Sequence, residues 1–281
     1  MKKVFLLLIL AVATFTLFGC NSSEYKVDGE FLAYEASVSH NAPQVVMVTV
    51  TIEDGEIVGY NIDTRQGNKV QNEDESWTFS WKEMTKKELG DDYGMATEDG
   101  QLEWYEQAEA LEAHWLENGV SIDEVDAEGN TDAVTGVTVT VDTYYELALE
   151  AIDLAKEGKF QAVYCTADDL VSATMMVDEK GVATDLVLDV LQGSPTGETF
   201  AFRDKTKQEL GLEYGMKDAS EIGKEWFEQA EAIAAYVLDN GADSIQVDDT
   251  GHISNITGAS VRNSGYSQVF EMLFDYANYE V

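Results

Sequence analysis

Glu103-Trp104-Tyr105-Glu106-Gln107-Ala108-Glu109-Ala110 occurs twice in this chain, the second time as Glu225-Trp226-Phe227-Glu228-Gln229-Ala230-Glu231-Ala232. The two copies stand 122 residues apart (225 − 103). Further pairs of segments keep this offset to within one residue: 85–90 with 206–211, 93–95 with 214–216, 118–119 with 240–241, and 135–136 with 257–258. Many matches at one long offset indicate a duplicated domain, because the repeats of a solenoid are much shorter.

Each copy opens with the pattern of a β-hairpin. Residues 46–52 alternate apolar side chains with Thr, Glu53-Asp54-Gly55 follows as a turn, and a second run covers 57–62. In the second copy, runs at 173–177 and 183–190 flank Glu179-Lys180-Gly181. Strand-forming runs bounded by turn residues predict paired antiparallel strands.

Helical spacing follows the hairpin in each copy. Apolar residues recur at intervals of 4, 3 and 4, which lines one face of a helix: Trp104, Ala108, Leu111 and Trp115, and again Trp226, Ala230, Ile233 and Val237. A closing helix is predicted from a second apolar face: Tyr144, Leu147, Ala148, Ala151 and Ile152, and again Tyr266, Val269, Phe270, Leu273 and Phe274. Gly119 and Gly241 favour left-handed C-caps.

These patterns predict an α+β protein of two tandem homologous domains, each an antiparallel sheet packed with helices. The domains are expected at 27–157 and 158–281, joined near 156–159. We also expect a short strand before each Thr-Gly pair, at 124–126 and 244–247.

The composition excludes one class of partner. The 281 residues include 54 Asp and Glu against 17 Lys and Arg, a formal net charge of −37. Such a chain repels the phosphate backbone, so it is not expected to bind nucleic acid. A charge of this size keeps a surface protein in solution, which is also its simplest interpretation.

The N-terminus has the layout of a secretory signal. Lys2 and Lys3 precede an apolar stretch over 4–18, which is short for a membrane span. The stretch ends in Leu17-Phe18-Gly19-Cys20, which resembles the lipobox of bacterial lipoproteins. The resemblance implies a signal peptide at 1–19, a lipidated Cys20, a tether over 20–26 and a place on the extracellular face of the cell membrane. An ordinary cleaved signal or a membrane anchor helix is the alternative.

The segment expected to carry chemistry precedes the last helix of each copy. It reads Asp132-Ala133-Val134-Thr135-Gly136-Val137-Thr138 in the first copy and Ser254-Asn255-Ile256-Thr257-Gly258-Ala259-Ser260 in the second. The N-terminus of a helix stabilises an anion, and a glycine lets backbone approach a ligand closely. A phosphate could be hydrogen-bonded there, or esterified to the hydroxyl of Thr138 or Ser260. A single such string is more often a turn with an N-capping hydroxyl, but its recurrence at matching positions favours function.

This duplicated segment resembles the flavinylation motif of FMN-binding domains, an acidic residue and two variable residues before Ser/Thr-Gly-Ala-Ser/Thr. Through its tandem layout, its lipobox and its Lys-x-Glu-Leu-Gly and Tyr-Gly-Met segments, nearly the whole chain resembles the extracellular electron-transfer lipoproteins of Gram-positive bacteria, also described as pheromone-encoding lipoproteins. Two departures are Val137, where the family usually has Ala, and Ser254, where the motif has an acidic residue that would help hold the metal ion of the transfer reaction.

The resemblance implies that a flavin transferase takes FMN from FAD and joins its phosphate to Thr138 and Ser260, giving up to two covalent FMN groups. It also implies an electron carrier rather than a stand-alone enzyme. Electrons would come from a membrane quinone-linked NADH dehydrogenase and leave to extracellular acceptors such as ferric iron.

Other residues have two interpretations each. Lys86 and Lys207 either bind the FMN phosphate or form surface ion pairs with neighbouring carboxylates. Tyr93-Gly94-Met95 and Tyr214-Gly215-Met216 either line the flavin ring or form turns with core side chains. Burial in the core is predicted for three residues: Trp104, Trp226 and Cys165. The three His residues are scattered, so neither a metal site nor a catalytic triad is expected.

Two rival functions remain open from the sequence. One is a surface lipoprotein that binds a ligand without redox chemistry. The other is a signalling role for a peptide cut from the leader, at about 12–19, which could coexist with electron transfer.

Overall fold

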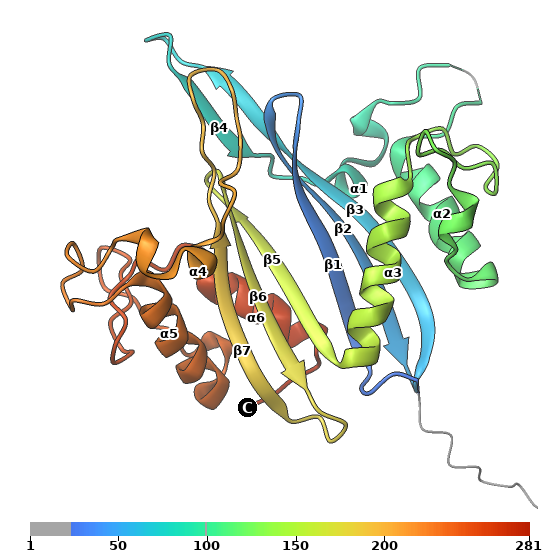
Figure 1. Ribbon diagram of the computed structural model, residues 1–281. Coiled ribbons are helices and arrows are strands. Elements are labelled where there is room, and N and C mark those ends of the chain that lie inside the picture. The colour runs from blue at the N-terminus through green and yellow to red at the C-terminus, as the bar shows by residue number, and fades with distance from the viewer. Residues whose placement is uncertain (1–23, 99) are drawn as a thin grey trace, which may run out of the picture.

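The computed structural model describes residues 24–98 and 100–281 (Figure 1). The expected signal peptide at 1–19, the lipidation site Cys20 and the first part of the tether lie outside the described residues. Within the described part of the chain, no helix is both long and apolar enough to span a membrane.

The first sheet is antiparallel and has the strand order β1-β2-β3-β4. Its strands are β1 (Gly29–Ser39), β2 (Ala42–Glu53), β3 (Glu56–Gln71) and β4 (Trp77–Trp81). The predicted hairpin is β2 and β3, which pair Val48 with Ile62. At its turn, Asp54 and Gly55 have positive φ angles of 52° and 75°, and the Asp28 carboxylate accepts hydrogen bonds from both amides. The pairing confirms the hairpin, whereas β1 and β4 were not predicted.

The second sheet repeats the first three strands. It has the order β5-β6-β7, made of β5 (Lys159–Thr166), β6 (Asp169–Val177) and β7 (Ala183–Leu191). The predicted hairpin is β6 and β7. Alternate side chains of β6 are buried, as expected of a strand with one face against a core.

Two long helices cover each sheet. In the first domain, α2 (Trp104–Asn118) packs on β3, and α3 (Asp142–Glu157) packs on β1 and β2. In the second, α5 (Trp226–Asn240) packs on β7, and α6 (Tyr266–Tyr276) packs on β5 and β6. The predicted faces are buried, except that Ile152 is only partly buried. This arrangement confirms the α+β class, with antiparallel sheets packed against helices, and apart from β4 the elements follow the same order in both copies.

A short helical pair precedes the first long helix of each copy. In copy one it comprises α1 (Lys86–Leu89) and the 3₁₀ turn η1 (Gly90–Tyr93). In copy two it comprises α4 (Lys207–Leu210) and η3 (Gly211–Tyr214). Thr85 and Thr206 cap α1 and α4 in capping boxes, accepting a bond from the third helical amide.

Two local predictions were wrong. In place of the strands at 124–126 and 244–247 there are 3₁₀ turns, η2 (Ile122–Glu124) and η4 (Ala242–Ser244), followed by single bridges from Val125 to Thr131 and from Val247 to Ile253. Among residues 24–98 and 100–281, no neighbouring strand extends either bridge into a ladder. Gly119 and Gly241 do have positive φ angles of 82° and 95°, but ψ angles of 168° and 158° place them outside the left-handed helical region.

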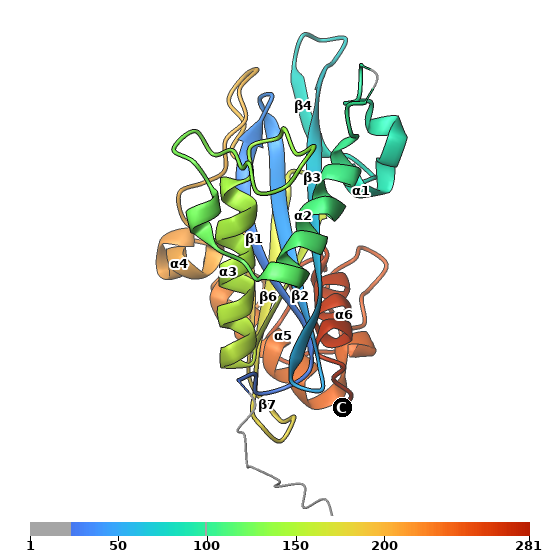
Figure 2. The same ribbon diagram turned by 90° about the vertical axis from the view of Figure 1, so that its right-hand side faces the viewer.

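The two sheets meet along the edge strands β1 and β5, with α3 and α6 on opposite sides of this layer (Figures 1 and 2). The rings of Phe31 and Phe160 stack there, with centroids 4.2 Å apart. Trp81 of β4 donates from its ring Nε1 to the Asp169 carbonyl at 3.0 Å. Cys165, expected in the core, is instead partly buried and lines a cavity of about 240 Å³ where the domains meet. The chain passes from α3 to β5 at Gly158.

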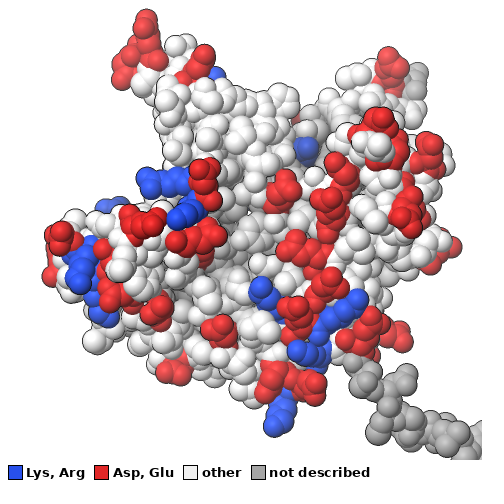
Figure 3. Space-filling model, in the orientation of Figure 1, with Lys and Arg blue, Asp and Glu red and all other residues white. Residues whose placement is uncertain are grey.

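Acidic side chains are spread over the face seen in Figure 3, while Lys and Arg gather at a few places. This spread is what the formal charge of −37 requires of the surface.

Candidate functional site

A buried or half-buried lysine stands between two aromatic rings in each copy. Lys86 Nζ lies 5.2 Å from the Tyr93 ring centroid and 5.1 Å from that of Trp104. In copy two, the ammonium of Lys207 lies 5.3 Å from the rings of Tyr214 and Trp226. Cation–π attraction stabilises an ammonium in such a position. The residues come together because the capped turns α1 and α4 start at the lysine.

The expected ion pairs of these lysines are not formed. Among residues 24–98 and 100–281, no carboxylate oxygen lies within 4.0 Å of Lys86 or Lys207. Burial, with a smaller contribution from Lys82, lowers the pKa of Lys86 from 10.5 to about 8. Burial also lowers the pKa of Lys207, against a partial opposing effect of Asp169. Each copy therefore holds a poorly solvated cation that an anionic ligand would stabilise.

The tryptophans belong to the core, as predicted, and connect the lysines to the last helix. Trp104 Nε1 donates to the hydroxyl of Tyr144 at 3.2 Å. In copy two, Trp226 Nε1 donates to Tyr266 at 3.1 Å. Burial raises the pKa of the Tyr266 hydroxyl to about 12, so this residue remains protonated at neutral pH.

A buried glutamate fixes each Tyr-Gly-Met segment. The Glu103 carboxylate accepts from the amides of Met95 at 2.9 Å and Ala96 at 3.0 Å. In copy two, Glu225 accepts from Met216 at 2.8 Å and Lys217 at 3.1 Å. The glycines Gly94 and Gly215 adopt left-handed conformations just before these bonds. Because Glu103 and Glu225 are also N-caps of α2 and α5, each segment is tied to the start of a helix.

A buried glutamine holds each proposed acceptor. Gln107 Oε1 accepts from the Thr138 amide at 2.7 Å, with the Thr138 hydroxyl 3.4 Å away. Gln229 Oε1 accepts from the Ser260 amide at 2.8 Å, with the Ser260 hydroxyl again 3.4 Å away. Both glutamine side chains are 0% exposed. Buried polar groups of this kind are costly unless bonded, so the glutamines constrain both loops.

The rest of each motif is a turn. Gly136 and Gly258 have φ angles of 89° and 96°, and the amide after each glycine bonds back to the carbonyl three residues before it. The side chains differ in exposure, as follows: Thr135, Asp132, Thr257 and Ser254 are exposed, Val137 is partly buried and Ala259 is buried. Thr138 lies four residues before Asp142, the first residue of α3. The Thr138 amide is therefore outside the first helical turn, and it donates to Gln107 Oε1.

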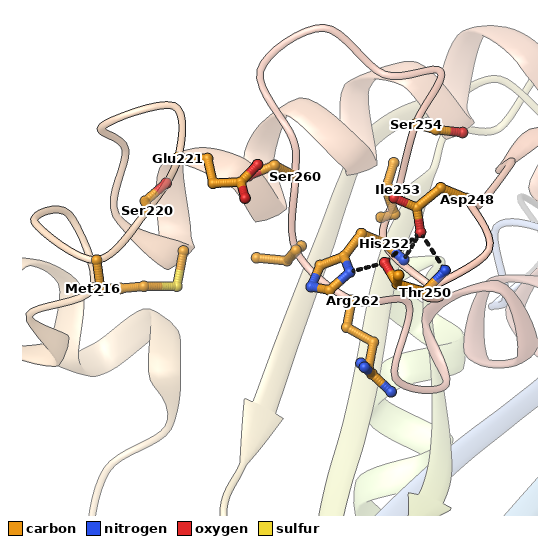
Figure 4. Close-up of a pocket in the computed structure, with 12 residues that line it drawn as sticks. Met216, Ser220, Glu221, Asp248, Thr250, His252, Ile253, Ser254, Ser260 and Arg262 are labelled. Atoms are coloured by element: carbon orange, nitrogen blue, oxygen red, sulfur yellow. Dashed lines mark hydrogen bonds between the residues drawn. The ribbon is translucent and has the colours of Figure 1, made fainter.

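A cavity of about 510 Å³ opens beside Ser260, the expected acceptor of copy two (Figure 4). Ser260 and Met216 both line it, together with Ser254, His252 and Arg262. Its volume lies within the range of small-molecule sites, about 300–1,000 Å³. The lining includes the polarizable side chain of Met216, which packs well on an aromatic ring, and the charged side chains of Glu221, Asp248 and Arg262.

The sequence did not identify four residues of this site, which are Gln107, Gln229, Glu103 and Glu225. The signal was nevertheless present, because all four stand in the repeated Glu-Trp-x-Glu-Gln segment. Within the described residues, no group of three or more His, Cys, Asp or Glu side chains could hold a metal ion.

Comparison with known proteins identifies no family. No protein-family model matches the chain, and no curated protein matches it. A solution NMR structure of a structural-genomics target from Clostridium thermocellum is 27% identical over 45% of this chain and 89% of that chain, with a TM-score of 0.30. A TM-score this low carries no argument about fold or function.

Proposed function

We propose that this chain is a lipid-anchored extracellular electron carrier that holds FMN through a phosphoester on Thr138 and on Ser260. The observation that carries the proposal is the duplicated constellation. In both copies, a Thr or Ser acceptor is held by a buried glutamine on the helix that also fixes a Tyr-Gly-Met segment and packs against a poorly solvated lysine.

The residues present fit such a group. A phosphoester adds negative charge, and the cation that lines the cavity beside Ser260 is Arg262. Lys86 and Lys207 contact aromatic rings of the same domains and are not placed against Thr138 or Ser260. Thr138 is exposed, so a transferase has access to its hydroxyl. In copy two, the cavity beside Ser260 has room for the flavin and is bordered by Met216. Bound FMN would supply the electron-transfer chemistry, while the protein sets its position and surrounding charge.

Attachment transfers the FMN group of FAD, through its phosphate, to the acceptor hydroxyl. The hydroxyl oxygen of Thr138 or Ser260 bonds to the FMN phosphorus, the pyrophosphate bond of FAD breaks, AMP leaves and the hydroxyl proton is released. A covalent bond prevents loss of the cofactor outside the cell, where no FMN pool would refill the site. The glutamines position each acceptor through its amide and do not themselves react.

The test is the intact mass and visible spectrum of the mature protein, produced with and without an active flavin transferase. We expect a gain of two FMN units and a flavin spectrum that survives denaturation. Thr138→Ala and Ser260→Ala should each remove one unit, whereas Thr140→Ala, two residues beyond the first acceptor, should remove none. No mass gain in the presence of transferase would refute the proposal.

The location and partners belong to the same proposal. Lipid at Cys20 would place the carrier on the outer face of the membrane, where a quinone-linked NADH dehydrogenase could reduce it and ferric iron could oxidise it. Labelling with a radioactive fatty acid should be lost in Cys20→Ala.

A second candidate function is supported by the cavity of copy two. Its volume and mixed lining would also suit a ligand held without a covalent bond. Under that alternative, the protein made without transferase would bind its ligand as well as the protein made with it, and Ser260→Ala would leave binding unchanged.

A further inference from the structure

The loop around Ser260 carries a cation that the loop around Thr138 lacks. A Cβ atom placed on Gly136 would lie 2.8 Å from Leu102 Cδ1, and one placed on Gly258 would lie 2.9 Å from Lys224 Nζ. Leu102 and Lys224 therefore occupy the same place against the two motifs, as their offset of 122 residues also indicates.

A second cation lines the cavity beside Ser260. Arg262 is the counterpart of Thr140, because the residue after each makes the same backbone bond to a glycine carbonyl: Val141 to Gly129 at 2.7 Å, and Asn263 to Gly251 at 2.9 Å. Arg262 and Ser260 both line the cavity (Figure 4). Among the described residues, neither Arg262 nor Lys224 has a carboxylate oxygen within 4.0 Å.

The acidic residues do not cancel this difference. Two carboxylates, Glu221 and Asp248, line the same cavity, and Asp126 stands at the counterpart position of Asp248 in the first copy. Copy two also has Ser254 where copy one has Asp132.

The two domains also differ in formal charge over their whole length. Residues 27–157 carry 6 Lys and Arg against 31 Asp and Glu, a formal charge of −25, whereas residues 158–281 carry 8 against 22, a formal charge of −14. On the face in Figure 3, Lys and Arg gather near α4 and α5, at the left, and again near the lower end of α3, while the region around α2 is mainly acidic.

From this asymmetry we infer that the two flavin sites are inequivalent, and that Lys224 and Arg262 give the flavin on Ser260 a higher midpoint potential than the flavin on Thr138. The inference rests on the proposed function. Uptake of two electrons and one proton leaves a flavin with one more negative charge, which nearby cations stabilise and nearby carboxylates destabilise. Electrons entering the chain would then collect in the second domain.

The experiment is a spectroelectrochemical titration of single-flavin proteins. Thr138→Ala carries its flavin only on Ser260, and Ser260→Ala only on Thr138. We expect the midpoint potential of the first protein to be the more positive. Lys224→Leu with Arg262→Thr, made in Thr138→Ala, should lower that potential, because it gives copy two the residues of copy one. The reciprocal change, Leu102→Lys with Thr140→Arg in Ser260→Ala, should raise the other potential.

The difference between the two potentials should shrink at high salt, because ions screen exposed charges. Equal potentials, or the reverse order, would overturn the inference, as would potentials that do not respond to either pair of exchanges. The reciprocal exchange is made in copy one, at exposed Thr140 and partly buried Leu102, so the test stands even if the copy-two variant does not fold. Single-site proteins that carry no flavin would instead overturn the proposed function.

Discussion

At the residue scale, the ammonium of Lys86 between two rings predicts a pH dependence of stability. Its pKa is about 8 in the folded protein against 10.5 for the ordinary group. Between these values the unfolded chain holds a proton that the folded protein has lost, so the contribution of Lys86 to the free energy of unfolding increases as the pH rises. Below pH 8 both states are charged and the folded state bears the cost of burial. Relative to Lys86→Met, we expect the unmodified protein to gain about 1–2 kcal/mol across this range, after allowance for solvent screening. Urea unfolding at several pH values measures this gain. Lys180→Met, in the exposed turn before β7, is the control, and parallel curves for Lys86→Met and the unmodified protein would contradict the prediction.

At the element scale, the N-cap of α5 also fixes the preceding loop at Met216 and Lys217. Glu225 caps α5 and accepts bonds from two amides of the Met216 segment. Glu225→Ala removes the cap of α5 and the acceptor of two part-buried hydrogen bonds, so we expect the free energy of unfolding to fall by about 1–2 kcal/mol. The amides of Met216 and Lys217 should also exchange faster with solvent deuterium. Glu231→Ala, an exposed position on the same helix, should change neither quantity. Unchanged amide exchange in Glu225→Ala would show that the loop does not depend on this carboxylate.

At the scale of the whole molecule, Trp81 of β4 links the first domain to the second. Trp81 donates to the Asp169 carbonyl through its ring and to the Ala167 carbonyl through its amide, and its ring stacks with Phe202. Trp81→Ala should cost about 2 kcal/mol and split a single thermal transition into two, because the domains lose shared contacts. Calorimetry measures both effects. Trp77→Ala, in the same strand but with its ring under Lys69, is the matched control. A single transition in Trp81→Ala would mean that the contact between β1 and β5 couples the domains by itself.

The sequence predicted much of the fold because that information is local. The repeat offset gave the duplication, and alternation of period two located the hairpins now seen as β2 with β3 and β6 with β7. Spacings of three and four located the buried faces of α2 and α5. The strands β1, β4 and β5 were missed. β1 and β5 each pair with the next strand through a tight turn, Ser39 with Ala42 and Thr166 with Asp169, so their pairing is local, whereas the contact between β1 and β5 at the domain boundary joins segments far apart in the chain. The wrong strands near Val125 and Val247 had suitable side chains but no neighbouring strand to extend a ladder.

Part of the candidate site could likewise be predicted from the sequence, and part became visible only in the structure. The sequence by itself indicated Thr138 and Ser260 as the proposed acceptors, through the resemblance of both segments to a flavinylation motif. It also located the paired Tyr-Gly-Met segments and the two lysines, because each recurs at a fixed offset. Only the tertiary structure decided that Gln107 and Gln229 hold those acceptors, across 31 residues of chain. It also decided that the lysines face rings instead of carboxylates, and that Lys224 and Arg262 stand beside one motif only. These facts depend on which surfaces are buried together when helices pack on sheets, and burial against a distant segment leaves no periodic pattern in the sequence.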